Sequence, residues 1–293
     1  MATKNIDSRR DIWGALISES TDDKVAILSN EKQFLFIGSE KCGKSSIQNA
    51  FFNRSDEPNP TLALSYQSAT LQSQELTKIL HFWELGGGSK LEPILDTIVT
   101  EENQLNFVIF ICFDISKNLS ILEATEWLPK IMRRFKKGYS SAFLIGTHYE
   151  DFENKDPSSK GKIISGLRSL AYQYGTGLIL FSNKNDFLIS RFKKLIKSLV
   201  LPDVKRPDPV TTHTGPTLIY QDNDDEAPGT EVAGQFLASL KIESDKEKSD
   251  NPKTVDLRVD DEVFAEEEID KLVQTNEKEL DEKIKLLQAS IND

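Results

Sequence analysis

The sequence has few of the residues that build disulfide frameworks or zinc sites, and it has no membrane-spanning run. Its 293 residues include two cysteines, Cys42 and Cys112, and three scattered histidines. Neither cysteine is placed as half of a disulfide framework, which fits a reducing compartment. The histidines lack metal-ligand spacing, and no apolar run approaches the ~18 residues of a membrane span. The first residues also lack a signal-peptide core, so we expect a soluble protein of the cytoplasm.

The sequence also lacks the excess of positive charge that is typical of nucleic-acid-binding proteins. Its net charge is −11. Residues 201–293 carry 24 Asp and Glu against 11 Lys and Arg, whereas residues 1–200 carry 23 against 25. The front of the chain is therefore nearly neutral and the back is acidic, which argues against nucleic acid as the main partner.

Strand and helix patterns alternate between residues 31 and 202. The run Phe107–Phe113 has seven consecutive apolar residues, as in a strand buried on both faces of a parallel sheet. The alternation predicts a doubly wound, mostly parallel α/β sheet. The expected strands are Phe34–Ile37, Leu62–Tyr66, Ile79–Trp83, Phe107–Phe113, Ala142–Ile145 and Leu178–Phe181, and the expected helices cover 44–52, 121–135, 163–174 and 187–199.

Other segments flank this domain. Residues 1–30 predict a lead-in with an amphipathic helix over 9–19. Residues 203–260 are rich in Pro, Asp, Ser and Lys and predict an acidic, flexible linker. Two apolar islands interrupt the linker, near residue 218 and at 232–242, and the second could be a short docking helix.

Residues 261–293 predict an amphipathic C-terminal helix that ends a largely disordered acidic tail. Its apolar stripe is narrow, which favours packing on a partner over packing on its own domain. A solitary charged helix that frays in solution is the alternative. The stripe contains Ile269, Val273, Asn276, Leu280, Ile284, Leu287 and Ile291.

The sharpest functional signal is the motif GxxxxGKS, which runs from Gly38 to Ser45 between an expected strand and an expected helix. In such a P-loop, backbone N–H groups and the helix N-terminus bind phosphate. Lys44 would reach the outer phosphates, and the hydroxyl of Ser45 would coordinate Mg²⁺. A strand–helix turn without a ligand stays the alternative. The residues expected to contact a nucleotide at this loop are Gly38, Lys41, Gly43, Lys44, Ser45 and Ser46.

The segments around this loop resemble Ras-like P-loop domains. In that resemblance Glu84 takes the acidic position at the end of the third strand, Gly87 the glycine that follows, and Gly88 the position of the water-orienting Gln. A glycine cannot orient an attacking water, and Glu40 places a carboxylate where small GTPases usually have Gly. The resemblance therefore implies a protein that is not an enzyme, with at most very slow GTP hydrolysis. A glycine-rich turn of purely structural use is equally open.

The same resemblance assigns the switch threonine. Thr61 follows Lys44 by seventeen residues and opens the segment PTLALSY. A threonine in this position contacts Mg²⁺ and the terminal phosphate, so Ser45 and Thr61 are the expected metal ligands.

Purine recognition is altered from the Ras-like pattern. Glu150, after the fifth strand, could accept hydrogen bonds from guanine, and Ser182 and Lys184, after the sixth, stand where a Ser-Ala-Lys motif covers the base. His148 lacks the long aliphatic stem that normally stacks along the base. The sequence leaves open whether the cofactor is GDP or GTP with Mg²⁺, or no nucleotide at all.

The pairing of PTLALSY with HFWELGGG, after GSEKCGKSS, is not a general GTPase pattern. It closely resembles the light intermediate chain family of dynein-2, and the segment DIWGALISE resembles the N-terminal helix of that family. The resemblance spans about residues 9–200 and implies a non-catalytic subunit that docks on the heavy-chain tail of dynein-2. The implied partners also include other dynein-2 intermediate and light chains and intraflagellar transport trains. The implied location is the cytoplasm, the cytoskeleton and the cilium or flagellum with its base.

The sequence leaves other functions open. The light intermediate chain of dynein-1 is the nearer alternative within the superfamily. A GTPase switch in ciliary or vesicle traffic would need a catalytic Gln and an Asn-Lys-x-Asp motif. An ATP-dependent phosphotransferase would need a lid of arginines, for which Arg133 and Arg134 are the paired candidates.

Overall fold

The computed structural model of the chain describes residues 30–72, 77–211, 215–222, 224 and 229–250. The chain divides into two compact units, Met1–Lys246 and Glu247–Asp293. The fold belongs to the first unit. The helices expected over 9–19 and 261–293 lie outside the described residues.

Seven strands form one mixed sheet in the order β2-β3-β1-β4-β5-β6-β7. The four inner pairings, from β3 through β1, β4 and β5 to β6, are all parallel, whereas β2 and β7 are antiparallel edge strands. Every residue of β4 is buried, as the seven-residue apolar run predicts. The strands are β1 (Glu31–Gly38), β2 (Leu64–Gln72), β3 (Thr77–Leu85), β4 (Phe107–Asp114), β5 (Ser141–Thr147), β6 (Gly177–Leu180) and β7 (Leu218–Ile219).

Helices connect the parallel strands, and local sequence signals start two of them. Asp156 accepts hydrogen bonds from the N–H groups of Ser158 and Ser159 and thereby caps α5. Asn185 caps α6 in the same manner. The helices are α2 (Lys44–Phe51), α3 (Asn118–Arg134), α4 (Tyr149–Glu153), α5 (Pro157–Gln173), α6 (Asp186–Val200) and α7 (Thr230–Asp250), with 3-10 turns η1 (Ser89–Thr97) and η2 (Gln104–Asn106).

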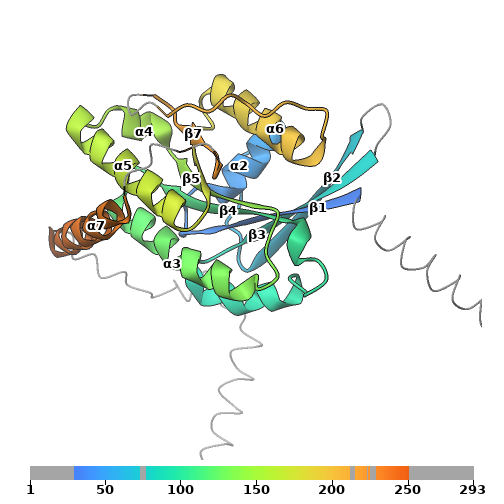
Figure 1. Cartoon of the computed structure of the whole chain (residues 1–293), viewed down its shortest axis with the longest axis horizontal. Helices are drawn as coiled ribbons and strands as arrows, with labels where there is room; N and C mark the ends of the chain where they lie inside the picture. Colours follow the sequence, from blue (N-terminus) through green and yellow to red (C-terminus); the bar gives the residue numbers. More distant parts are fainter. Residues whose placement is uncertain (1–29, 73–76, 212–214, 223, 225–228, 251–293) are drawn as a thin grey trace, which may run out of the picture. The chain divides into compact units, whose positions relative to one another are not determined.

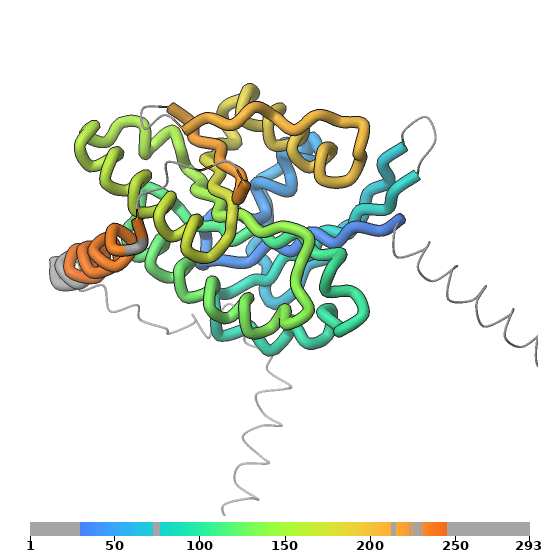
Figure 2. The backbone as a smooth tube through the Cα atoms, in the orientation of Figure 1, coloured from blue at the N-terminus to red at the C-terminus, as the bar shows by residue number. Residues whose placement is uncertain are grey.

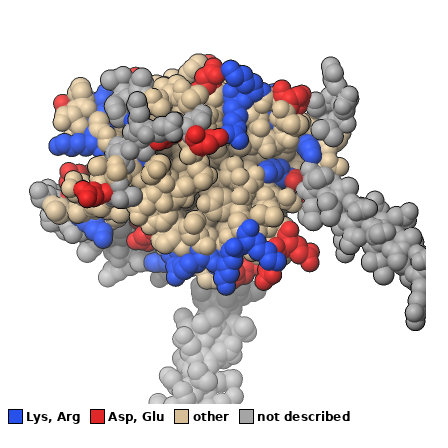
Figure 3. Space-filling view, viewed as in Figure 1, with Lys and Arg blue, Asp and Glu red and all other residues tan. Residues whose placement is uncertain are grey.

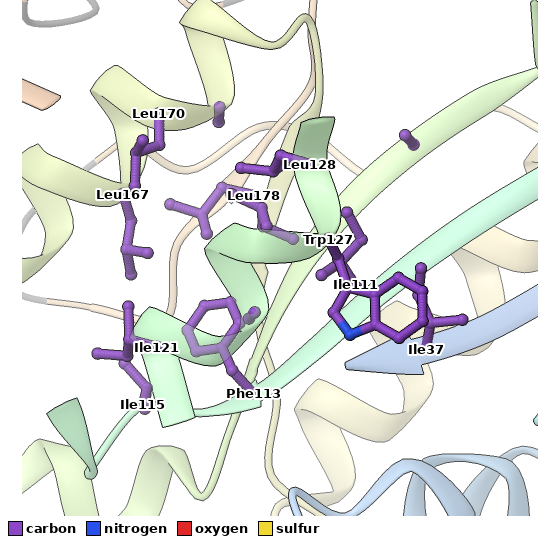
Figure 4. Close-up of a cluster of buried hydrophobic side chains, with 14 of the residues drawn as sticks. Ile37, Ile111, Phe113, Ile115, Ile121, Trp127, Leu128, Leu167, Leu170 and Leu178 are labelled. Carbon is purple, nitrogen blue, oxygen red and sulfur yellow. The ribbon is translucent and has the colours of Figure 1, made fainter. Parts of the chain in front are cut away.

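The helices cover both faces of the sheet (Figure 1). On one face, phenylalanines of β1, β3 and β4 pack against one another and against α2 and α6, with the ring centroids of Phe36 and Phe110 4.9 Å apart. On the other face, α3 packs on β1 and β4, α5 packs on β6, and α7 joins the same hydrophobic cluster. Figure 4 shows Trp127 of α3 lying over Ile37 and Ile111 of the sheet in this second cluster. The doubly wound, mostly parallel α/β fold is thus confirmed.

The structure corrects the expected flexible linker after residue 202, over the part that is described. β7 pairs with β6 and closes that edge of the sheet. Arg191 of α6 donates to the carbonyl of Pro216 at 2.8 Å, and the hydroxyl of Tyr220 donates to the carbonyl of Pro207 at 2.9 Å. Figure 2 shows this segment running beside α6 before it turns to the sheet. Composition did not predict this strand, because the apolar run that is buried here has only three residues, starting at Leu218, and lies within a polar stretch of sequence.

α7 also differs from the expectation, because it packs on its own domain. Ala233, Phe236 and Leu240 are buried at helical spacing and join the core cluster of α3 and α5. The ring of Phe236 rests directly on Gly166 of α5, where a Cβ would lie 2.1 Å from its Cγ. The island at 232–242 therefore contributes to the folded unit. Residues 251–260 of the expected linker lie outside the described residues.

A buried ion pair secures the chain between β7 and α7. The guanidinium of Arg168 on α5 donates through Nε to Asp224 at 3.1 Å, and a second nitrogen also contacts that carboxylate. Both side chains are buried, and the hydroxyl of Ser169 donates to the carbonyl of Gly229 at 2.8 Å. Removal of one partner would leave an uncompensated buried charge, which is strongly destabilising.

Acidic and basic side chains lie mixed on the face that Figure 3 shows. Arg134, at the end of α3, pairs with Glu92 at 3.2 Å and also contacts Asp96. The Arg134–Glu92 pair is partly buried, whereas Asp96 is exposed, and an ion pair with an exposed partner contributes little stability. In the described part of the chain, no helix combines the length and apolarity that a membrane crossing needs.

Replacement of Gly166 with Ala should destabilise the domain by about 1–3 kcal/mol, because the added methyl would overlap the ring of Phe236. Gly161→Ala is a matched control on the same helix, where nothing lies within 4 Å of the added Cβ. That control should gain about 0.5–1 kcal/mol from helix propensity. Denaturant unfolding measures both changes. Equal stability of the two variants would show that α7 does not pack on α5.

Candidate nucleotide-binding site

The phosphate loop takes a shape that its first and last glycines alone permit. Gly38 has φ +139°, and a Cβ on it would lie 1.9 Å from the carbonyl oxygen of Cys112. Gly43 has φ +84° and stands immediately before α2. Lys41 also adopts a positive φ, of +53°, which is uncommon for a residue with a side chain. The loop therefore lies against the end of β4 and delivers the chain to the N-terminus of α2.

Lys44 is buried, and its Nζ donates to the carbonyl of Ser39 at 2.8 Å. This contact holds the ammonium over the loop, where the P-loop mechanism needs a positive charge. A cavity of about 400 Å³ opens beside it. Among the predicted residues, the cavity is lined by Lys41, Gly43, Lys44, Ser45, Ser46, Thr61, Glu84 and Gly87.

The two expected Mg²⁺ ligands converge on one carboxylate oxygen. The hydroxyls of Ser45 and Thr61 donate to Oε1 of Glu84 at 2.6 and 3.0 Å. A hydroxyl that donates its proton keeps lone pairs for a cation, and Mg²⁺ prefers such oxygen ligands. The residues present therefore fit a nucleotide-bound Mg²⁺, which would neutralise phosphate charge when bound. In the described residues, no group of three His, Cys, Asp or Glu forms a metal cluster.

Two consecutive glycines form a turn next to Glu40 at the edge of the cavity. Gly87 and Gly88 have φ +55° and +33°, and Gly88 offers no side chain to an attacking water. Oε1 of Glu40 lies 3.8 and 3.9 Å from the positions that Cβ atoms on these glycines would take. The carboxylate of the exposed Glu40 thus lies beside the glycine turn, where its negative charge would repel a terminal phosphate.

The predicted base-binding residues also come together. Nζ of Lys184 pairs with Oε1 of Glu150 at 3.2 Å, and the hydroxyl of Ser182 accepts from the N–H of Lys184 at 3.1 Å. Burial raises the pKa of Glu150, but the nearby Ser182 hydroxyl and Lys184 outweigh it and hold the pKa below its usual range. Oε2 of Glu150 is buried with no hydrogen-bond partner among the described residues. Glu150 is not among the residues that line the cavity beside Lys44, and its assignment to purine recognition stays a prediction.

Sequence reasoning missed the role of Thr147. Its hydroxyl lies 2.6 Å from the carbonyl of Cys42 in the phosphate loop and 2.9 Å from the carbonyl of Phe113. This side chain therefore ties the end of β5 to the loop. A small hydroxyl residue at the position of the usual Asn was the signal that could have revealed it. The neighbouring His148 has φ +55°, so the turn into α4 is tight.

Thr147→Val should cost about 1–3 kcal/mol of unfolding free energy, because the buried carbonyl of Cys42 loses its donor at nearly constant volume. Thr176→Val is the matched control, since the hydroxyl of Thr176 is buried without a hydrogen-bond partner among the described residues. The control should lose no stability. Denaturant unfolding of both variants checks the prediction, and equal losses would contradict the tie between β5 and the loop.

Comparison with known proteins agrees with this geometry. The chain is 28% identical over 221 residues to cytoplasmic dynein 2 light intermediate chain 1 of Bos taurus, with 62% of each chain covered. The protein of the same name from Mus musculus is 28% identical over 208 residues, with 58% of this chain and 59% of the relative covered. That from Danio rerio is 26% identical over 231 residues, with 66% and 64% covered.

The matches extend over about three fifths of the length of these relatives. Their shared name confirms the resemblance to the dynein-2 light intermediate chains that the motifs predict. The model of the Ras family matches residues 33–197, from β1 to the last turns of α6. This span is more than half of the chain and holds both the sheet and the phosphate loop, so the chain belongs to the Ras family.

Proposed function

We propose that the chain is a non-catalytic light intermediate chain of the dynein-2 motor. In this role it docks on the heavy-chain tail, together with the other intermediate and light chains, and supports retrograde intraflagellar transport and cilium assembly. It acts in the cytoplasm, on the cytoskeleton and in the cilium or flagellum, including its base. The similarity to relatives that all carry the dynein-2 name is the observation that carries the proposal. Fold alone would not, because Ras-like folds host many functions.

The geometry of the cavity supports the non-catalytic part of the proposal. Gly88 offers nothing to orient water, and the carboxylate of Glu40 stands beside the glycine turn. A bound guanine nucleotide would then stabilise the fold by mass action, without turnover. The phosphate side, with Lys44 and the two converging hydroxyls, is suited to holding such a ligand.

A nucleotide switch in ciliary or vesicle traffic is the second candidate. The complete P-loop favours it, since a switch mechanism begins with a bound nucleotide. A phosphotransferase has less support. Arg134 is paired with Glu92 and Asp96, and Nε of Arg133 donates to the carbonyl of Pro129 in its own helix. Neither arginine lines the phosphate cavity.

Purified protein should hold guanine nucleotide at one equivalent or not at all, and it should not hydrolyse GTP appreciably. Nucleotide content and steady-state phosphate release measure this. If nucleotide is held, Lys44→Ala should lower the melting temperature more than it alters association with the motor. A rate of GTP hydrolysis equal to that of an activated small GTPase would exclude the proposed non-catalytic subunit and favour the nucleotide switch.

A chain truncated after Asp250 should still co-purify with the dynein-2 heavy chain from ciliated cells. Truncation near residue 204 is unsuitable, because it would remove β7 and α7 and expose the core that they cover. In the full chain, Leu280→Asp with Leu287→Asp should weaken association with the heavy-chain tail or a neighbouring subunit, if the expected C-terminal helix binds there. The melting temperature of the domain should stay unchanged. Complete loss of the heavy chain on truncation after Asp250 would contradict docking by the Ras-like domain.

A further inference from the structure

The segment that leads into β2 lies unusually close to the end of β3. The N–H of Gly86 donates to the carbonyl of Ala63 at 2.7 Å. A Cβ on Gly86 would lie 2.0 Å from the carbonyl oxygen of Thr61, so only glycine permits this approach. The two backbones therefore meet before the regular pairing of β2 with β3 begins at Leu64 and Leu85.

Glu84 joins this contact to the phosphate loop. Its side chain is 3% exposed, and one oxygen, Oε1, accepts from Thr61 in the segment and from Ser45 in the first turn of α2. Hydrogen bonds to a buried carboxylate are short and strong relative to neutral ones. A single oxygen thus links three elements that belong to distant parts of the sequence.

The length of the glutamate side chain decides how this link is made. An aspartate is one methylene shorter, so its carboxylate would fall short of both hydroxyls and would need an intervening cation or water. Glutamate reaches both hydroxyls directly, at 2.6 and 3.0 Å. The protein's own atoms then make the connection that a Ras-like switch otherwise obtains from Mg²⁺ and the terminal phosphate.

We propose that Glu84 is a built-in latch that holds the segment 58–63 against β3 independently of nucleotide and Mg²⁺. It is a positioning residue that acts through Thr61. The latch goes beyond the subunit role, since it concerns the state of this segment in any complex. One consequence concerns Leu62, whose side chain is 91% exposed on the latched segment. The latch presents that side chain in one place, whatever the nucleotide state.

Hydrogen–deuterium exchange of the full chain tests the latch through the amide of Gly86, which reports the bond to Ala63. In the wild type, this amide should be equally protected in EDTA without nucleotide and in Mg²⁺ with GDP or a non-hydrolysable GTP analogue. Glu84→Asp should exchange about tenfold faster in EDTA, equivalent to about 1.4 kcal/mol. Protection should return with Mg²⁺ and nucleotide, because aspartate then acts through the cation.

Thr61→Val removes the hydroxyl alone and should show the same loss in EDTA, even if Glu84→Asp folds poorly. Thr70→Val is the matched control, since Thr70 is exposed on β2 and outside the latch. Amides of β4 report whether each variant stays folded. Wild-type protein whose Gly86 amide becomes protected only with Mg²⁺ and nucleotide would overturn the latch. Folded Thr61→Val with wild-type protection in EDTA would overturn it as well.

Discussion

The carbonyl oxygen of Cys112, at the end of β4, accepts hydrogen bonds from the N–H of Ser39 at 3.2 Å and from the thiol of Cys42 at 3.3 Å. The phosphate loop can approach this oxygen only because Gly38 has no side chain. From the other side, the hydroxyl of Thr147 reaches the carbonyl of Cys42. The loop is therefore fixed between the carboxyl ends of two buried parallel strands, the edge at which open α/β sheets bind ligands. The positions of Lys44, of the cavity and of the Glu84 contacts all follow from that fixation.

The edge of the sheet at β6 is extended by later parts of the chain, and this extension decides where the folded domain ends. On the β6 side the chain returns after α6, adds β7 and then lays α7 over α5. These additions are secured by the buried pair of Arg168 and Asp224. The folded unit thus continues beyond residue 197, where the match to the Ras family ends. Any experiment that separates the domain from the acidic tail has to respect the later boundary.

Most of the inner sheet could be predicted, because its signal is local. The apolar run of β4, the glycine loop and the helix after it each carry their pattern within about ten residues. β7 could not be predicted in this manner. It has two residues, and it forms because the edge of β6 and the guanidinium of Arg191 on α6 are in place to receive it. α7 was underestimated for a related reason, since charged residues on its exposed side hide the burial of Phe236 on Gly166.

In the candidate site, too, some features could be predicted from the sequence and others could not. The residue types of the phosphate loop follow from its motif, because the need for glycine and lysine is chemical and local. The tie from Thr147 to the loop depends on the spacing of two parallel strands, which no motif encodes. Oε1 of Glu84 accepts two hydrogen bonds because the glutamate side chain is one methylene longer than aspartate and so reaches both Ser45 on α2 and Thr61 before β2. Sequence reasoning assigned Glu84 only to the acidic position at the end of the third strand, because it compared residue types and could not compare distances.

A P-loop that is built into its fold in this way does not by itself indicate an enzyme. Lys44 donates to Ser39, Ser45 and Thr61 donate to Glu84, and Thr147 donates to Cys42. Each of these contacts lies within the protein and contributes to stability without a ligand. A buried donor or acceptor that loses its partner is costly, so each of these residues has a structural reason to be present.

Residues that take part in hydrolysis differ from these, because a side chain that orients a water serves only the reaction. Under the Ras-like resemblance, Gly88 and Glu40 stand at positions that serve the reaction, whereas the residues named above also brace the fold. This separation agrees with the proposed role in assembly of the motor, in which the domain has no need to hydrolyse nucleotide.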